Sequence, residues 1–205
     1  MYRGERLNSI THLLGSVFAL IGLIVLVIRA AFAGDPWKIV SFSIFGITLV
    51  VLYTSSALYH SIRGASKKLF QKIDHSAIYL LIAGSYTPFT LVTLRGAWGW
   101  SLFGVVWGLA VIGILQDVLF AKRKHILSVV IYLMMGWIAM VAVRPLSLAL
   151  PGAGMTLLIS GGLFYTVGIV FYALDKKFEY SHGIWHLFVL AGSVCHYFAI
   201  LLYVA

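Results

Sequence analysis

Two histidines near the C-terminus have the spacing of paired metal ligands. His182 and His186 are four residues apart, so on a helix their side chains share one face and lie about 6 Å apart along the axis. A third histidine, His60, comes near the end of an earlier apolar stretch. Three protein ligands with an open fourth position are typical of catalytic zinc, whereas a structural zinc site is closed by four ligands. The sequence therefore predicts Zn2+ bound by His60, His182 and His186.

Two polar residues that flank His60 could supply the rest of the chemistry. Asp74 follows His60 beyond a short basic segment, and its carboxylate could hydrogen-bond a water molecule at the metal and accept its proton. Ser56 precedes His60 by one helical turn on the same face, which suits a contact with the ligands or with a substrate. We therefore predict Asp74 and Ser56 as catalytic residues. No glutamate follows His182 directly, which excludes the HExxH arrangement of zinc proteases.

A polar stripe opens the first apolar stretch of the chain. Glu5, Asn8 and His12 are three and four residues apart, so they fall on one face of a helix. They either line the cytoplasmic mouth of the metal site or cap and anchor the first helix. The spacing fits both interpretations.

Two other polar residues within apolar stretches have a structural interpretation. Asp117 lies close to the basic cluster at 122–124, which we expect to neutralise its charge. His196 lies about 15 Å along a helix from His186, too far to share a metal ion with it. We expect His196 to hydrogen-bond between helices instead.

The elements that position these residues must lie in lipid. Of the 205 residues, 61% are hydrophobic and 10% are charged, against about 45–50% and about 25% in soluble domains. A chain this apolar cannot cover itself with polar surface, which excludes a water-soluble protein. With about 20 residues per crossing, we predict an all-α membrane protein, a single domain over residues 1–205 with seven transmembrane helices. The predicted spans are 8–28, 38–62, 74–94, 97–120, 126–143, 152–174 and 182–204, the third kinked at Pro88.

The distribution of lysine and arginine predicts the orientation of the bundle. With a cytoplasmic N-terminus and an extracytoplasmic C-terminus, eleven of the 15 basic residues lie in inner segments and four in outer segments, as the positive-inside rule requires. The inner set is Arg3, Arg6, Arg63, Lys67, Lys68, Lys72, Lys122, Arg123, Lys124, Lys176 and Lys177, and the outer set is Arg29, Lys38, Arg95 and Arg144. This bias accounts for the net charge of +9 without a nucleic-acid partner.

In this orientation the chemically interesting residues converge on one membrane layer. The second span ends on the cytoplasmic side with His60, and the third and seventh spans begin there with Asp74 and with His182 to His186. The polar stripe begins the first span on the same side. Because this convergence was not used to choose the orientation, it supports a single site.

The first span has a competing interpretation. Two arginines, an apolar stretch and the Ala-Phe-Ala sequence at 31–33 are the pattern of a signal peptide with a small-residue cleavage site. Cleavage would leave six spans. The polar stripe and Arg29 are unusual in such a segment, so we favour an uncleaved first helix.

Taken in order, the motifs form one series along the chain. The series is Glu5-x2-Asn8-x3-His12, Ser56-x3-His60, Asp74, Gly84-Ser85-x2-Pro88 and His182-x3-His186 with His196. It resembles the signature of the haemolysin III and progestin/adipoQ receptor family over nearly the whole chain. The compact size, without a long N-terminal domain, is similar to the bacterial branch of that family.

The resemblance implies a seven-helix bundle of the bacterial inner membrane, with zinc near the cytoplasmic side. It implies His60, His182 and His186 as zinc ligands, Asp74 as the residue that contacts a water molecule, and Ser56 as the motif serine. Eukaryotic relatives are linked to ceramide hydrolysis, whereas bacterial members carry a haemolysin name and a proposed role in membrane fluidity homeostasis. None of the motifs identifies the substrate.

Three functions follow as hypotheses. The favoured one is zinc-dependent, ceramidase-like hydrolysis of a lipid amide or ester that affects membrane lipid homeostasis, with membrane lipids as partners. The second is a non-enzymatic membrane-state sensor or regulator with structural zinc. The third is a membrane-lytic, haemolysin-like protein, although the chain has no long amphipathic segment apart from its spans.

Two other classes of membrane protein fit poorly. A retinal protein needs a lysine inside a helix for its Schiff base, and the last span has none over 182–205. A di-haem cytochrome needs widely spaced histidine pairs on two helices, whereas His182 and His196 offer such a pair on one helix only.

Overall fold

The computed structural model describes residues 3–119, 125–175 and 177–204, and every regular element in this part of the chain is a helix. Within these described ranges, seven helices are long and apolar enough to cross a membrane, which confirms the predicted bundle. The elements are η1 (Arg3–Glu5), α1 (Arg6–Ala33), α2 (Pro36–Ser61), α3 (Ser66–Pro88), η2 (Phe89–Thr93), α4 (Ala97–Leu119), α5 (His125–Trp137), η3 (Ile138–Ala142), α6 (Val143–Ala149), α7 (Gly152–Ala173) and α8 (Ser181–Tyr203).

Three predicted connections are wrong because the helices around or within them extend further than predicted. The third span begins at Ser66 rather than at Asp74, so Asp74 lies in the third turn of α3. The predicted loop at 144–151 is largely the helix α6. An apolar window marks only the part of a helix that matches the hydrocarbon core, whereas the helix continues into polar turns on either side. The wide connection predicted at 29–37 shrinks to two residues between α1 and α2.

Local sequence explains that short connection. Gly34 ends α1 in the left-handed conformation, with φ of 64°, which glycine adopts without steric cost. The Asp35 side chain then accepts a hydrogen bond from the backbone N–H of Trp37 at 2.9 Å, and Pro36 occupies the first turn of α2. An acidic cap followed by proline is a favourable helix start.

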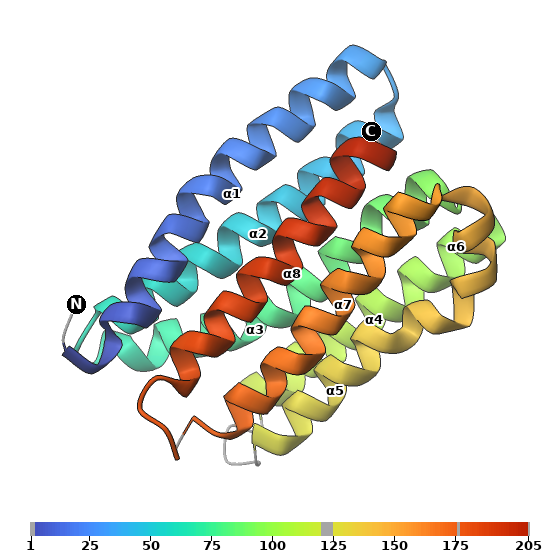
Figure 1. Cartoon of the computed structure of the whole chain (residues 1–205). Coiled ribbons are helices and arrows are strands. Elements are labelled where there is room, and N and C mark those ends of the chain that lie inside the picture. The colour runs from blue at the N-terminus through green and yellow to red at the C-terminus, as the bar shows by residue number, and fades with distance from the viewer. Residues whose placement is uncertain (1–2, 120–124, 176, 205) are drawn as a thin grey trace.

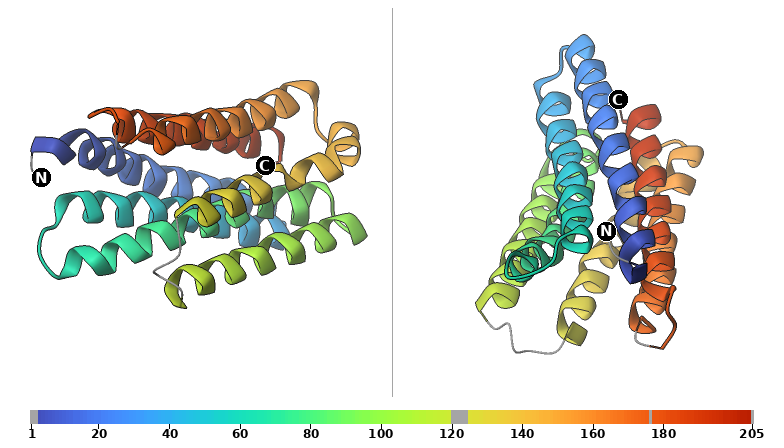
Figure 2. Two further views of the ribbon diagram at one scale, coloured as in Figure 1. Left: turned by 90° about the horizontal axis from the view of Figure 1, so that it is seen from below. Right: turned by 90° about the vertical axis from the view of Figure 1, so that its left-hand side faces the viewer.

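The long helices run roughly along one direction, with α8 between α1 and α7 (Figure 1). The start of α1 lies at the same end of the bundle as the α2–α3 connection and the start of α8, as the two further views also show (Figure 2). We call this the N-terminal end of the bundle. It therefore brings together segments from the beginning, the first third and the last part of the chain.

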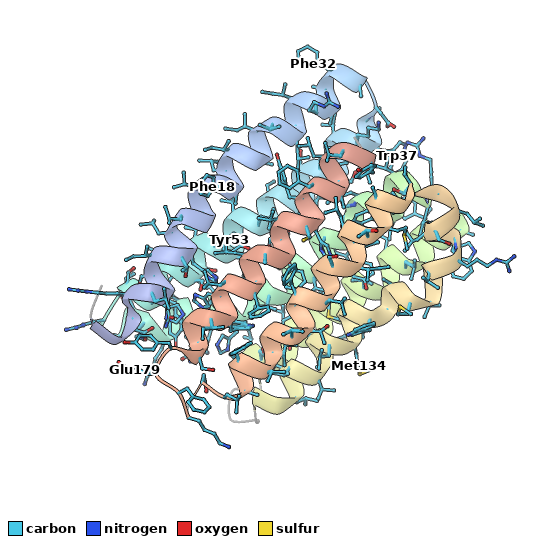
Figure 3. The ribbon with its side chains drawn as sticks, in the orientation of Figure 1. Phe18, Phe32, Trp37, Tyr53, Met134 and Glu179 are labelled. Atoms are coloured by element: carbon cyan, nitrogen blue, oxygen red, sulfur yellow. The ribbon has the colours of Figure 1, made fainter. Side chains whose placement is uncertain are left out.

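Side-chain hydroxyl groups fix α8 between its neighbours. Tyr53 of α2, labelled in Figure 3, donates a hydrogen bond to the Ser193 hydroxyl of α8 at 2.6 Å. The hydroxyl of Tyr165 in α7 lies 2.9 Å from the same Ser193 oxygen. Buried polar groups in lipid need such partners. Three helices are thereby tied together at Ser193.

The fifth span is interrupted where Tyr86 of α3 enters its hydrogen-bond ladder. The Tyr86 hydroxyl accepts the backbone N–H of Ala139 at 2.9 Å and lies 2.8 Å and 2.7 Å from the carbonyl oxygens of Met135 and Gly136. In a regular helix the N–H of Ala139 would bond to the carbonyl of Met135. An inserted side chain is a known cause of helix breaks, and here η3 separates α5 from α6.

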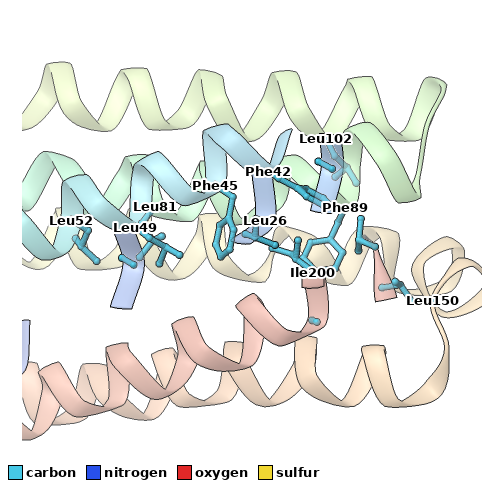
Figure 4. Packing of buried hydrophobic residues seen from close by; sticks show 14 of the residues in the cluster. Leu26, Phe42, Phe45, Leu49, Leu52, Leu81, Phe89, Leu102, Leu150 and Ile200 are labelled. Atoms are coloured by element: carbon cyan, nitrogen blue, oxygen red, sulfur yellow. The ribbon is translucent and has the colours of Figure 1, made fainter. Parts of the chain in front are cut away.

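The bundle is apolar both inside and outside. Its core packs large side chains from α1, α2, α3 and α8, including Leu26, Phe42, Phe45 and Ile200 (Figure 4). On α1, Phe18 and Phe32 are 69% and 88% exposed and point away from the other helices (Figure 3). Such an exposed apolar surface requires a lipid solvent.

Candidate metal centre

Three histidines from two helices form a triangle at the N-terminal end of the bundle. His60 lies in the last turn of α2, and His182 and His186 lie in the first two turns of α8. Their potential ligand atoms all lie within 4.8 Å of one another, and the ring centroids are 4.8–5.1 Å apart. The residues predicted from spacing and depth are therefore brought together, and they could hold one metal ion.

The hydrogen bonds of two rings leave one nitrogen of each available. Nδ1 of His186 lies 3.3 Å from the backbone carbonyl of Asn8, and Nδ1 of His60 lies 2.5 Å from the Glu5 carboxylate. Because both partners accept hydrogen bonds, each Nδ1 carries the proton and each Nε2 keeps a lone pair. Both Nε2 atoms are buried and without a hydrogen-bond partner in the described structure. A divalent metal ion fits this donor set, since it would satisfy both.

Glu5 is held by partners from three segments. It accepts a hydrogen bond from the Asn8 side chain at 2.8 Å, and Lys67 of α3 lies 3.3 Å away. Burial raises the pKa of the Glu5 carboxyl, but the hydrogen bonds from His60 and Asn8 and the nearby positive charges outweigh it and hold the pKa at about 2. Glu5 therefore carries its negative charge at neutral pH.

The polar stripe does not cap α1 in the way that one interpretation proposed. Glu5 occupies the position before α1, yet its side chain makes no capping hydrogen bond. It crosses to His60 of α2 instead. There the carboxylate accepts a charge-assisted hydrogen bond from the His60 ring, which links α1 to α2.

His12 covers the other face of the triangle. Its ring stacks on His186, with centroids 3.6 Å apart and planes 11° apart, and meets Tyr53 edge-on at 5.0 Å. Both His12 nitrogens are buried and lack a partner in the described structure. His12 thus contacts His186 and also lines the cavity described below.

Asp74 of α3 and Ser56 of α2 are in contact with each other. Both side chains are buried, with exposed fractions of 6% and 1%. Asp74 projects from the third turn of α3 and Ser56 from α2, one turn before His60. With His12, they line one end of a partly open cavity of about 220 Å³.

The rest of that cavity is almost entirely apolar. Along α3 and into the first residue of η2 it extends from Asp74 to Phe89, which is about 22 Å of helix. Residues from α5, α6, α7 and α8 complete its walls, among them Leu146, Leu158, Ile169 and Val189. An elongated apolar cavity with polar groups at one end is suited to a lipid chain with a polar head.

Sequence reasoning missed one acidic residue. Asp175, on the connection between α7 and α8, has a carboxylate oxygen 3.7 Å from Nδ1 of His182. It precedes His182 by seven residues across an irregular segment, so no helical spacing points to the contact. The only signal available was an acidic residue shortly before a predicted ligand.

The remaining polar residues stay outside the triangle. Nε2 of His196 donates to the carbonyl of Leu158 in α7 at 3.2 Å, so its predicted interhelical bond is present. Asp117 accepts a hydrogen bond from Ser128 of α5 at 2.7 Å. Its predicted partners at 122–124 lie outside the described residues.

Comparison with known proteins decides the family. The family model described as "Haemolysin-III related" matches residues 1–197. The chain belongs to the haemolysin III family. Together with the seven apolar helices, this makes it a multi-pass bacterial membrane protein of that family.

Bacterial and animal proteins resemble the haemolysin III chain over most of their length. It is 48% identical to a hemolysin-3 homolog of Bacillus subtilis, covering 97% of this chain and 93% of the relative. It is 45% identical to hemolysin-3 of Bacillus cereus, with 98% and 91% covered. A human monocyte to macrophage differentiation factor is 28% identical, with 94% and 81% covered.

Proposed function

We propose that this haemolysin III family protein is a zinc-dependent hydrolase of a membrane lipid amide or ester. The observation that carries the proposal is that one end of the apolar cavity is lined by Asp74, by Ser56, which lies one helical turn before His60, and by His12, whose ring stacks on His186. A polar reaction centre beside an acyl-sized apolar space matches the shape of a lipid. Turnover of such a lipid would alter membrane lipid homeostasis.

Each of the chain's own groups has a role in this reaction. His60, His182 and His186 would hold the zinc ion, which supplies Lewis acidity and lowers the pKa of water to about 7. Asp74 accepts the proton of the attacking water and later passes it to the leaving nitrogen or oxygen. Ser56 holds the Asp74 carboxyl in place through their side-chain contact.

The cavity supports a substrate with a long acyl chain. Its extent of about 22 Å along α3 and into η2 exceeds the half-thickness of a bilayer's hydrocarbon core, about 15 Å. The chain would lie among the apolar walls with its carbonyl beside Asp74. The acyl carbon gains the hydroxyl of water, so the products are a fatty acid and an amine or alcohol.

The test combines metal analysis with lipid turnover. Purified wild type should contain about one zinc per chain and cleave a member of a lipid panel that includes ceramides. Asp74→Asn should retain zinc and lose turnover by about 10²–10⁴-fold, the usual contribution of a general acid–base group. Zinc-loaded wild type that cleaves no lipid in the panel would contradict the proposal.

A second function is favoured by the attachment of the triangle to two helices. Because His60 lies on α2 and the other two histidines on α8, a bound metal would tie these spans together in a sensor or regulator. In that case, His186→Ala would lose zinc and thermal stability in proportion, while wild type would show no turnover. A lytic activity is named only in the relatives, and dye release from liposomes tests it here.

A further inference from the structure

The polar stripe of α1 makes contacts that neither a cap nor an open mouth explains. Glu5 reaches Nδ1 of His60, the backbone carbonyl of Asn8 faces Nδ1 of His186, and the Asn8 side chain donates to Glu5. The stripe therefore contacts two rings of the triangle through their Nδ1 atoms. None of these contacts uses an Nε2 atom, and the Nε2 atoms of His60 and His186 are buried without a hydrogen-bond partner in the described structure.

The third ring, that of His182, also presents its Nδ1 atom to an acceptor, which lies on the connection between α7 and α8. Nδ1 of His182 faces the Asp175 carboxylate at 3.7 Å. That distance is an ion-pair contact rather than a hydrogen bond, so it is weaker than the contact of Glu5 with His60. All three rings nevertheless present Nδ1 to an acceptor, and the acceptors come from both ends of the chain.

We infer that Glu5 and Asp175 are positioning residues of the metal centre, which fix His60 and His182 with Nδ1 protonated and Nε2 directed to the metal. This inference rests on the proposed function, because it assumes that the triangle binds a metal. It assigns the polar stripe to the metal centre, with Asn8 orienting Glu5 and supplying the matching backbone acceptor for His186.

Chemistry favours this arrangement for two reasons. A carboxylate that accepts the Nδ1 proton selects the tautomer that binds metal through Nε2 and makes that nitrogen more basic. Two carboxylates also balance the double charge of a divalent ion held by three neutral imidazoles. This balance is favourable because an uncompensated charge is costly close to lipid. A histidine cluster that served only to pack helices would not need a carboxylate beside a second ring.

Neighbouring side chains fix the orientation of the Glu5 carboxylate. The Glu5 side chain is 21% exposed, and Asn8 and Lys67 hold its two oxygens from different directions. The carboxylate is therefore oriented before any metal arrives. A preorganised acceptor costs less entropy than one that must be ordered on binding.

The experiment compares zinc affinity in three variants by chelator competition, with Co2+ absorption as a second readout of coordination geometry. Glu5→Gln keeps the shape but removes the charge, and should weaken zinc binding about 10–100-fold. Asp175→Asn should weaken it by a smaller factor because of its longer contact. Glu179→Gln is the matched control, since Glu179 is an exposed carboxylate on the same connection (Figure 3) and should change nothing.

The outcomes separate this inference from the proposed function. Wild type that binds no divalent metal ends the proposed function, whereas tight binding in wild type and Glu5→Gln alike overturns the inference alone. Equal losses in all three variants also overturn it, because they would show a general charge effect. Should Glu5→Gln fail to fold, ¹⁵N NMR of zinc-loaded wild type decides: metal bound through Nδ1 of His60 contradicts the inference, and protonated Nδ1 supports it.

Discussion

At the scale of single residues, two adjacent glycines of α7 have opposite surroundings. A β-carbon at Gly161 would lie 2.3 Å from Cδ2 and 2.5 Å from Nε2 of the His196 ring. A β-carbon at Gly162 would meet nothing within 4 Å. The absence of a side chain at Gly161 therefore lets α7 and α8 approach closely enough for His196 to bond to Leu158.

This contrast predicts different effects of the same substitution. Gly161→Ala must displace a ring that is held by a hydrogen bond, so it should lower the free energy of unfolding by about 1–3 kcal/mol. Gly162→Ala should be neutral or stabilising by up to about 1 kcal/mol, since alanine is the better helix former. Thermal unfolding in detergent measures both. Equal melting temperatures for the two variants would contradict this prediction, because they would show that α7 can move away from α8 without a loss of stability.

How far sequence can locate a site is also visible at this scale. His182 and His186 were found because helical spacing places them on one face, and His60 and Asp74 because they share their depth in the membrane. The contact of Glu5 with His60 could not be derived, since 55 residues separate them and no periodicity links two different helices. The role of Asp175 was hidden for the same reason.

At the scale of elements, the interruption of the fifth span depends on a neighbouring helix. Residues 138–142 contain no glycine or proline, but Pro145 follows them and lacks the N–H that a continuous helix would donate to the carbonyl of Val141. The hydroxyl of Tyr86 from α3 adds a second contribution, because it accepts the N–H of Ala139. Hydropathy cannot reveal this second contribution, since it depends on a contact between two helices.

Removing the Tyr86 hydroxyl tests how far the structure of the fifth span depends on it. In Tyr86→Phe the backbone N–H of Ala139 loses its partner, which costs about 1–3 kcal/mol when the group stays buried. We expect a lower melting temperature and faster hydrogen exchange at Ala139, with Tyr180→Phe on the exposed α7–α8 connection as the control. Unchanged exchange at Ala139 would mean that α5 restores its own ladder.

At the scale of the whole molecule, the charge distribution predicts which end of the bundle faces the cytoplasm. Among the described residues, seven of the eleven lysines and arginines lie in segments at the N-terminal end, so the candidate metal centre should lie on the cytoplasmic side. The seven apolar spans alone are compatible with either direction, because each is long enough to cross the membrane whichever end faces the cytoplasm.

Cysteine labelling tests the orientation. The only native cysteine is Cys195, so Cys195→Ser gives a background without thiols. In intact cells a membrane-impermeant maleimide should label Ala97→Cys, at the far end of the bundle, and should label Glu179→Cys only after permeabilisation. The reverse pattern would establish the opposite orientation.

The contact between Asn8 and His186 joins residues 178 positions apart, and this has a consequence for biogenesis. A chain is made and inserted from its N-terminus, so Glu5, Asn8 and His12 enter the membrane long before α8 exists. Until the ribosome has released α8, only one of the three rings is present. Under the proposed metal binding, loading can therefore only be the last step of assembly, and a nascent chain truncated before residue 181 should bind no zinc.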